Sequence, residues 1–261
     1  MLKQRVITAI VAVAALLLVL FVLPQMVAQV VVAAVILAGA WEWSGFLGST
    51  STSLRAGYVV VIALLMALVT WLAPQINSHL FQVALVWWMG ALVWTMFYPT
   101  RIPAVVRWVA GMLVLLPLYN ALIVLYLASP AVLLGALLIV WAADTGAFAA
   151  GKLFGRVKLA PKISPGKTWE GVIGGLLTVA MLAVAGACLF DVRVAVLVPF
   201  CLAVACASIV GDLTVSMFKR TSGLKDSGSI FPGHGGILDR VDSVAAAAPL
   251  FALGIGWTGL Q

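Results

Sequence analysis

The chain has 261 residues, of which 64% are hydrophobic and only 9% are charged, and its mean hydropathy is +1.20. Ordinary soluble domains are about 45–50% apolar and about 25% charged, so this composition excludes a water-soluble enzyme, a disordered chain and a collagen-like chain. The net charge of +7 would suggest a nucleic-acid partner in a soluble protein, but in a membrane protein it is typical of basic cytoplasmic loops. We therefore expect an integral membrane protein that binds no nucleic acid.

Nine apolar stretches are predicted to be transmembrane helices, since a span needs about 20 residues. They cover residues 6–23, 26–40, 57–73, 80–98, 108–128, 131–150, 171–190, 194–211 and 243–260. The first could instead be a cleaved signal peptide, but it exceeds the usual apolar run of about 7–15 residues and no small-residue cleavage site follows it. The sequence thus predicts an all-α polytopic membrane protein with nine transmembrane helices and cytoplasmic catalytic loops.

The basic residues support this count and set the orientation. If the N-terminus is cytoplasmic, every second gap between spans is cytoplasmic too, and of the 15 Lys and Arg residues only Arg193 then lies outside. The C-terminus is then expected on the outer side. Because polar residues gather late in the chain, residues 1–130 are predicted to be a transmembrane scaffold. Residues 131–261 are predicted to be the catalytic region, with cytoplasmic loops at 151–170 and 212–242.

Six of the eight acidic residues lie between Asp144 and Asp242 on or near the expected cytoplasmic face, whereas Glu42 and Asp191 are isolated. Asp144 stands near the end of an apolar stretch, and Asp212 follows another in the same way. A carboxylate inside a span costs at least about 2.5–3.5 kcal/mol, so it usually faces the protein interior and has a function. The alternative is a carboxylate at the interface that reaches out to water.

The loop at 151–170 contains a distinctive polar sequence from Lys162 to Glu170. It includes Gly-Lys-Thr, but a phosphate-binding P-loop is excluded because Pro161 stands where that motif needs glycine. Ser164 followed by Pro165 suits the N-cap and first position of a helix, so we expect a helix to begin at Pro165. A helix N-terminus beside lysines favours phosphate binding. The alternative is that the lysines only reflect the charge of a cytoplasmic loop. Gly171 and Gly175 are four apart and are expected to let two helices pack closely.

The segment from Ser216 to Asp242 carries the strongest signal. If the helix after the eighth stretch continues, spacings of four, seven and eight residues place polar side chains on one face; these are Asp212, Ser216, Lys219 and Arg220. A Gly- and Ser-rich stretch follows, whose glycines let the backbone approach a ligand closely. Asp239 and Asp242 then share a helix face, and such paired carboxylates suit Mg²⁺ and its bound polyphosphate. A solvated salt-bridge network is the alternative.

These residues resemble the signature of the phosphatidate cytidylyltransferase (CDP-diacylglycerol synthase) family. The match over residues 216–242 is made by Ser216, Lys219, Arg220, Lys225, Asp226, Gly228, Phe231, Pro232, His234, Gly235, Gly236, Asp239, Arg240 and Asp242. Two further segments, Asp144–Phe148 and Ser164–Gly171, also resemble family motifs, whereas the N-terminal half is similar only in hydropathy.

The resemblance implies that CTP and phosphatidate from the bilayer give CDP-diacylglycerol and pyrophosphate with Mg²⁺, and it leaves room for a second, monovalent cation. It also implies a homodimer in a bacterial inner membrane. Catalytic roles are expected for Asp144, Lys167, Asp212, Lys219, Arg220, Asp239 and Asp242. Metal binding is expected at Asp212 and Asp239, with Asp144 and Asp242 next. Substrate binding is expected at Lys162, Ser164, Lys167, Thr168, Glu170, Ser216, Lys219, Arg220, Lys225, Asp226, His234, Gly235, Gly236 and Arg240.

The alternative function is a cation-coupled membrane transporter. It predicts charges near the bilayer midplane and two similar halves, whereas here the charges gather at one face and the halves differ. A lipid-phosphate phosphatase would need a nucleophile constellation that the two histidines hardly provide.

Overall fold

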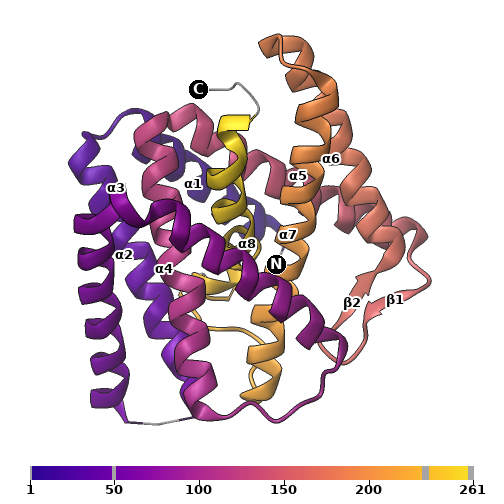
Figure 1. Ribbon diagram of the computed structural model, residues 1–261. Coiled ribbons are helices and arrows are strands. Elements are labelled where there is room, and N and C mark those ends of the chain that lie inside the picture. Colours follow the sequence, from indigo (N-terminus) through magenta and orange to yellow (C-terminus); the bar gives the residue numbers. More distant parts are fainter. Residues whose placement is uncertain (1, 49–50, 231–234, 258–261) are drawn as a thin grey trace.

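The computed structural model describes residues 2–48, 51–230 and 235–257, with the side chains of 2–7, 9, 73 and 74 left out. The chain is a bundle of long helices with one small β-hairpin (Figure 1). The helices are α1 (Leu2–Phe21), α2 (Gln25–Ser44), η1 (Gly45–Leu47), α3 (Thr52–Met96), α4 (Ala104–Ala128), α5 (Pro130–Phe154), α6 (Trp169–Phe190), α7 (Val194–Thr221), α8 (Leu238–Gly254) and η2 (Ile255–Trp257). The hairpin strands are β1 (Lys158–Ala160) and β2 (Ser164–Thr168).

Seven segments of the described chain are long and apolar enough to cross a membrane, which confirms the polytopic all-α class. They are Gln25–Leu47, Thr52–Leu72, Gln75–Met96, Ala104–Ala128, Pro130–Phe154, Trp169–Phe190 and Val194–Thr221. The count of nine is not confirmed. The expected first span corresponds to α1, of which Ile10–Phe21 qualifies only as a shorter apolar helix, and the expected ninth to α8, which has 17 residues. The end of the expected ninth span lies outside the described residues.

The third and fourth expected spans belong to one helix. Helix α3 has 45 residues, and its two span-length segments follow each other with almost no gap. Figure 1 shows the first half and the second half of α3 running in different directions, so that the second half crosses the bundle. Hydropathy alone located both segments but could not show that no loop separates them.

Helices α5 and α6 pack closely through small residues. A side-chain carbon on Gly175 would lie 2.6 Å from the backbone oxygen of Ala143, and one on Gly171 would lie 2.9 Å from that of Ala147. A side-chain carbon on Gly146 of α5 would likewise collide with Thr178 and lie close to the backbone of α6. The predicted packing role of the two α6 glycines is therefore confirmed. This contact fixes Asp144 of α5 beside the start of α6.

The prediction that Ser164 caps a helix beginning at Pro165 is wrong. Residues 164–168 form strand β2, which pairs antiparallel with β1, and α6 begins only at Trp169. The cap is Thr168, whose hydroxyl accepts a hydrogen bond from the Gly171 amide at 3.1 Å. Proline suits the edge of a short hairpin as well as a first helical turn, and the neighbouring β1 segment provides a partner strand. A proline at position 165 is therefore compatible with both a helix start and a strand, and the local sequence does not distinguish the two.

Helix α7 runs through the polar stretch and packs against α8. The condition that the helix continues past Asp212 is confirmed, because α7 ends at Thr221. Gly211 allows the two helices to approach closely, since a side-chain carbon there would collide with the backbone oxygen of Asp242. Most of α8 is buried, and it also contacts α3 and α4. The carboxylates of α7 and α8 are thereby brought to one region.

Candidate active site

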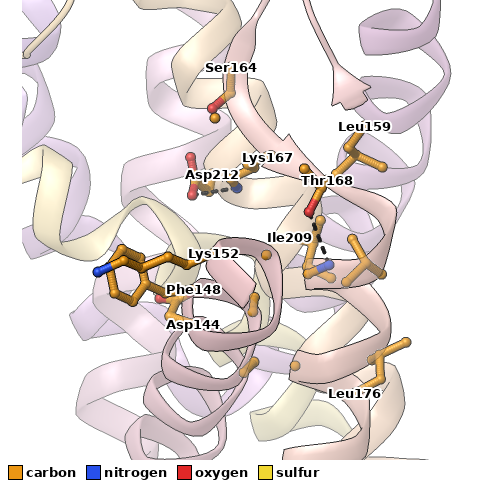
Figure 2. Close-up of a pocket in the computed structure, with 17 residues that line it drawn as sticks. Asp144, Phe148, Lys152, Leu159, Ser164, Lys167, Thr168, Leu176, Ile209 and Asp212 are labelled. Carbon is orange, nitrogen blue, oxygen red and sulfur yellow. Dashed lines mark hydrogen bonds and ion pairs between the residues drawn. The ribbon is translucent and has the colours of Figure 1, made fainter. Parts of the chain in front are cut away.

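A cavity of about 490 Å³ lies between α5, the hairpin and the start of α6, with α7 behind it (Figure 2). Its polar lining consists of Asp144, Lys152, Ser164, Lys167, Thr168 and Asp212. The remaining lining is mostly apolar and includes Phe148, Leu159, Leu176 and Ile209. The cavity therefore joins charged groups to an apolar wall, as a site for an amphipathic substrate requires.

Lys167 and Asp212 form an ion pair across this cavity. Lys167 extends from strand β2, and its Nζ lies 2.5 Å from Oδ2 of Asp212 on α7. The other carboxylate oxygen of Asp212 accepts a hydrogen bond from Ser216, one helical turn later, at 3.1 Å. Both ends of the ion pair remain about a quarter exposed, at 28% and 25%. The two predicted segments, 151–170 and 212–242, are thus brought into direct contact.

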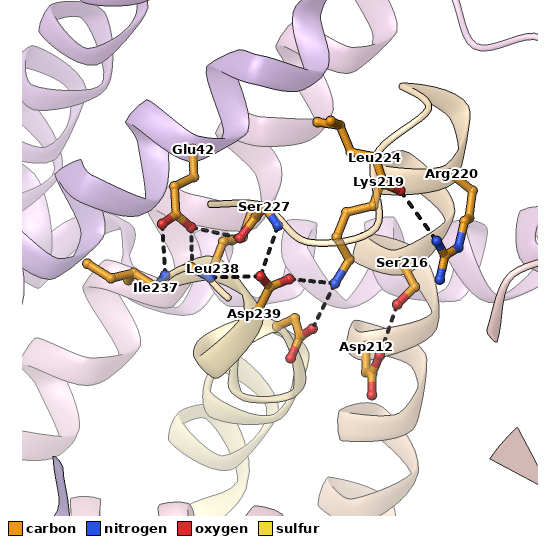
Figure 3. A network of polar contacts seen from close by, with 12 residues as sticks. Glu42, Asp212, Ser216, Lys219, Arg220, Leu224, Ser227, Ile237, Leu238 and Asp239 are labelled. Carbon is orange, nitrogen blue, oxygen red and sulfur yellow. Dashed lines mark hydrogen bonds and ion pairs between the residues drawn. The ribbon is translucent and has the colours of Figure 1, made fainter. Parts of the chain in front are cut away.

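A second charged group lies on α7 and α8. Lys219 Nζ is 2.7 Å from Oδ1 of Asp239 and 3.8 Å from Oδ2 of Asp242, as Figure 3 shows. The other oxygen of Asp239 accepts hydrogen bonds from the backbone amides of Ser227 and Gly236, each at 2.9 Å. Burial raises the pKa of Asp239, but the hydrogen bond and charge of Lys219 together with the two amide hydrogen bonds outweigh burial and hold the pKa below its usual value. The prediction that Asp239 and Asp242 face the same way is confirmed.

The two charged groups are close enough to interact. Asp212 interacts electrostatically with both Asp144 and Asp242. Within the described ranges, no group of three His, Cys, Asp or Glu side chains is drawn together tightly enough to hold a metal ion. The donor chemistry nevertheless suits Mg²⁺, since Asp144, Asp212, Asp239 and Asp242 all provide carboxylate oxygens. Lysines pair with three of these carboxylates in the structure.

Several predicted substrate-binding residues make contacts within the protein. The carboxylate of Glu170 accepts hydrogen bonds from the Val157 amide at 3.1 and 3.2 Å, which joins the two ends of the hairpin. Nε of Arg220 donates to the backbone oxygen of Ile163 at 3.1 Å, so α7 and the hairpin are tied at a second point. The side chains on the exposed surface are Lys162, Lys225, Asp226 and Arg240. His234 lies outside the described residues.

Glu42 looks isolated in the sequence and no role was predicted for it, yet it contacts the predicted catalytic segment. Its carboxylate, on α2, accepts hydrogen bonds from the Ser227 hydroxyl and from the amides of Ile237 and Leu238. Figure 3 shows Glu42 reaching from α2 to this segment, close to Asp239. The sequence did contain a signal for this contact, since a lone acidic residue among apolar ones must find partners when it is buried.

A second cavity of about 520 Å³ adjoins the first. It lies between the end of α3, the hairpin, α6 and α7, and its walls include Tyr98, Trp169 and Leu213. The two cavities share Leu159, Val172 and Ile209 as lining residues. Lys162 lies on the hairpin side of the second cavity, whose lining is otherwise mostly apolar. A cavity that carries charged groups thus stands next to a mostly apolar one beside the hairpin.

The fold and site define a polytopic membrane protein in which lysines and carboxylates from separate segments meet, an arrangement suited to phosphate chemistry. The chain belongs to the cytidylyltransferase family, whose model matches residues 3–256.

Its relatives include two phosphatidate cytidylyltransferases that match almost end to end. The one from Pseudomonas aeruginosa is 41% identical over 97% of this chain and 96% of its own length. The one from Haemophilus influenzae is 36% identical over 97% and 98%. A phosphatidate cytidylyltransferase from Staphylococcus aureus is 49% identical, but over only 45% of this chain and 46% of its own. The family resemblance is thereby confirmed, and the transporter alternative receives no support.

Proposed function

We propose that the chain transfers the cytidylyl group of CTP to phosphatidate, giving CDP-diacylglycerol and pyrophosphate. The relatives that match almost end to end carry this activity in their names. The observation that carries the proposal is the Lys167–Asp212 ion pair in the first cavity, which interacts with the buried group of Lys219, Asp239 and Asp242 and stands next to the second, apolar cavity. A phosphorylated lipid and a nucleoside triphosphate both need cationic groups, and the lipid also needs an apolar surface.

The bond changes require little proton transfer. An oxygen of the phosphatidate phosphate attacks the α-phosphorus of CTP, and the bond from that phosphorus to the oxygen of the β-phosphate breaks, releasing pyrophosphate. A phosphate monoester has its second pKa near about 6, so it is already mostly ionised at neutral pH and needs no strong general base. Catalysis is then positioning and charge neutralisation, for which Lys167 and Lys219 are placed.

The carboxylates are proposed to hold Mg²⁺. Asp212 and Asp239 are the first candidates and Asp144 and Asp242 the next, with a monovalent cation as a possible second ion. When bound, Mg²⁺ would neutralise charge on the triphosphate. Asp212 offers the more accessible carboxylate, since its side chain is 25% exposed and that of Asp239 only 7%. Lys167 and Lys219 balance the carboxylates and also face the phosphates.

The proposal includes a setting in the membrane. We place the N-terminus and both polar loops on the cytoplasmic side of a bacterial inner membrane, because the basic residues segregate there. Residues 1–130 act as scaffold and 131–261 as the catalytic region. Phosphatidate enters sideways from the bilayer, and a homodimer is the proposed assembly.

The test is a reaction with purified protein in mixed micelles. Radiolabelled CTP, phosphatidate and Mg²⁺ are combined, and label in the extracted lipid is measured against reactions lacking phosphatidate or lacking Mg²⁺. We expect labelled CDP-diacylglycerol and pyrophosphate in equal amounts only when all three are present. Asp212→Asn should form neither product. Release of pyrophosphate without labelled lipid would contradict the proposal.

A further inference from the structure

Glu42 lies at the contact between the first part of the chain and the polar segment before α8. Only 3% of this residue is exposed. Oε1 accepts a hydrogen bond from the Ile237 amide at 2.9 Å, and Oε2 accepts from the Leu238 amide and the Ser227 hydroxyl, each at 2.8 Å. Burying a carboxylate is costly unless it is paired and hydrogen-bonded, so these three donors stabilise it where it lies.

These contacts make Glu42 the cap of α8. The first amides of a helix have no partner within the helix, and an acidic group near them is stabilising. Ile237, at the N-cap position, has an apolar side chain and cannot accept their hydrogen bonds. Glu42 accepts them from another helix, α2. The start of α8, which carries Asp239 and Asp242, is thereby held by a residue almost 200 positions earlier in the chain.

Two glycines of the same segment leave room for the Glu42 carboxylate. A side-chain carbon on Gly228 would lie 2.5 Å from Oε1, and one on Gly236 would collide with both carboxylate oxygens. The glycines were expected to let the backbone approach a ligand. At Gly228 and Gly236, the group that the backbone approaches is the Glu42 carboxylate. Backbone on both sides of residues 231–234 is fitted around one carboxylate.

We propose that Glu42 is a positioning residue of the transfer site. It holds the Ser227 hydroxyl and the backbone at Ile237 and Leu238. The amides of Ser227 and Gly236, in the same stretches of backbone, hold Asp239, and Asp239 in turn accepts a hydrogen bond from Lys219. Glu42 is not among the residues that line either cavity beside the hairpin. Three protein donors occupy both of its carboxylate oxygens and the residue is only 3% exposed, so Glu42 acts through the segment and not on substrate. This inference rests on the proposed function for its kinetic part only.

The experiment combines hydrogen exchange with kinetics on Glu42→Gln. The amide group keeps the shape, but its nitrogen would face at least one of the three donors. We expect faster exchange in the peptide that contains Ile237 and Leu238. Per folded enzyme, kcat should fall about 10²-fold, because a small misplacement of reacting groups can cost this much. KM for CTP and phosphatidate should stay within about threefold, since Glu42 contacts the segment and not the cavities.

Two other variants keep the test decisive. Ser227→Ala removes one donor and should fold even if Glu42→Gln does not, with faster exchange and a kcat loss of about tenfold. Asn120→Ala is the control, because Asn120 is equally buried and hydrogen-bonds Asn77 between α3 and α4, away from the segment. It should lower thermal stability and leave kcat per folded enzyme unchanged.

The outcomes separate the inference from the proposed function. Unchanged exchange in both Glu42→Gln and Ser227→Ala overturns the anchoring by Glu42. Faster exchange with unchanged kcat overturns its role in positioning. If the unmodified protein forms no CDP-diacylglycerol, the proposed function fails, and exchange still decides whether Glu42 holds the segment.

Discussion

The two lysines of the site are predicted to respond differently to the same substitution. Lys167 and Lys219 each pair with carboxylates, but Lys167 lies in a partly exposed ion pair and Lys219 in a buried one. We compare Lys167→Met with Lys219→Met, since methionine keeps much of the length and removes the charge. Lys167→Met should remove activity and leave stability nearly unchanged, whereas Lys219→Met should reduce both.

The magnitudes follow from exposure. Lys167 and Asp212 keep 28% and 25% of their side chains exposed, and such pairs contribute about 0–1 kcal/mol to the free energy of unfolding. The side chains of Lys219, Asp239 and Asp242 are only 9%, 7% and 11% exposed. Removing one partner of a buried pair costs about 3–5 kcal/mol, because the other charge stays buried. For activity, the loss of one charged group that faces the transition state costs about 10²–10³-fold in kcat.

The assays are thermal unfolding in detergent and initial rates of lipid labelling with equal amounts of folded enzyme. Lys167→Arg is the matched control. It keeps the charge but changes the geometry from a compact ammonium to a planar guanidinium, so a partial loss of rate is expected. If Lys167→Met lowers the unfolding temperature as much as Lys219→Met does and turns over at nearly the normal rate, Lys167 is a structural residue and the reasoning is refuted.

Further expectations concern the carboxylates, the basic residues and the orientation. Asp212→Asn should abolish turnover with little change in thermal stability. Asp239→Asn should abolish turnover and also destabilise the protein, because Asp239 accepts three hydrogen bonds. Retained activity in either variant would remove that residue from the set of proposed metal ligands. Asp144→Asn should raise the Mg²⁺ concentration needed for half-maximal rate, measured by Mg²⁺ titration. Lys167→Ala and Arg220→Ala should change the KM for CTP and phosphatidate unequally, and equal changes would indicate one shared anion site. A periplasm-specific reporter fused to the C-terminus should be active, and a cytoplasm-specific reporter there should not.

The sequence predicted the polar face of α7 and its partners well, because those features depend on local spacing. Helical periodicity placed Asp212 and Ser216 one turn apart, and they are hydrogen-bonded in the structure. The spacing of Asp239 and Asp242 likewise placed both within reach of one lysine. Hydropathy located the long apolar helices for the same reason. Each of these predictions concerns residues within a few turns of one another.

The errors arise where distant segments decide the outcome. Residues 164–168 carry a serine and a proline that suit a helix start, yet β1 pairs with them and Thr168 provides the cap. Glu42 looked isolated because its three donors lie 185 or more positions later in the chain. No local pattern contains such information. A lone carboxylate in an apolar stretch shows only that some partner must exist.

The contact at Glu42 also gives the first part of the chain a physical role in the site. Helix α7 supplies Lys219 and α8 supplies Asp239, but the segment between them is rich in glycine and polar residues and has little apolar surface to bury. Such a segment loses much conformational entropy when it is ordered. Hydrogen bonds to Glu42, together with one from the Ser222 hydroxyl to the Phe46 backbone oxygen at 3.2 Å, compensate for part of that loss. The α2–η1 region therefore stabilises the segment that the charged residues of α7 and α8 need in order to meet.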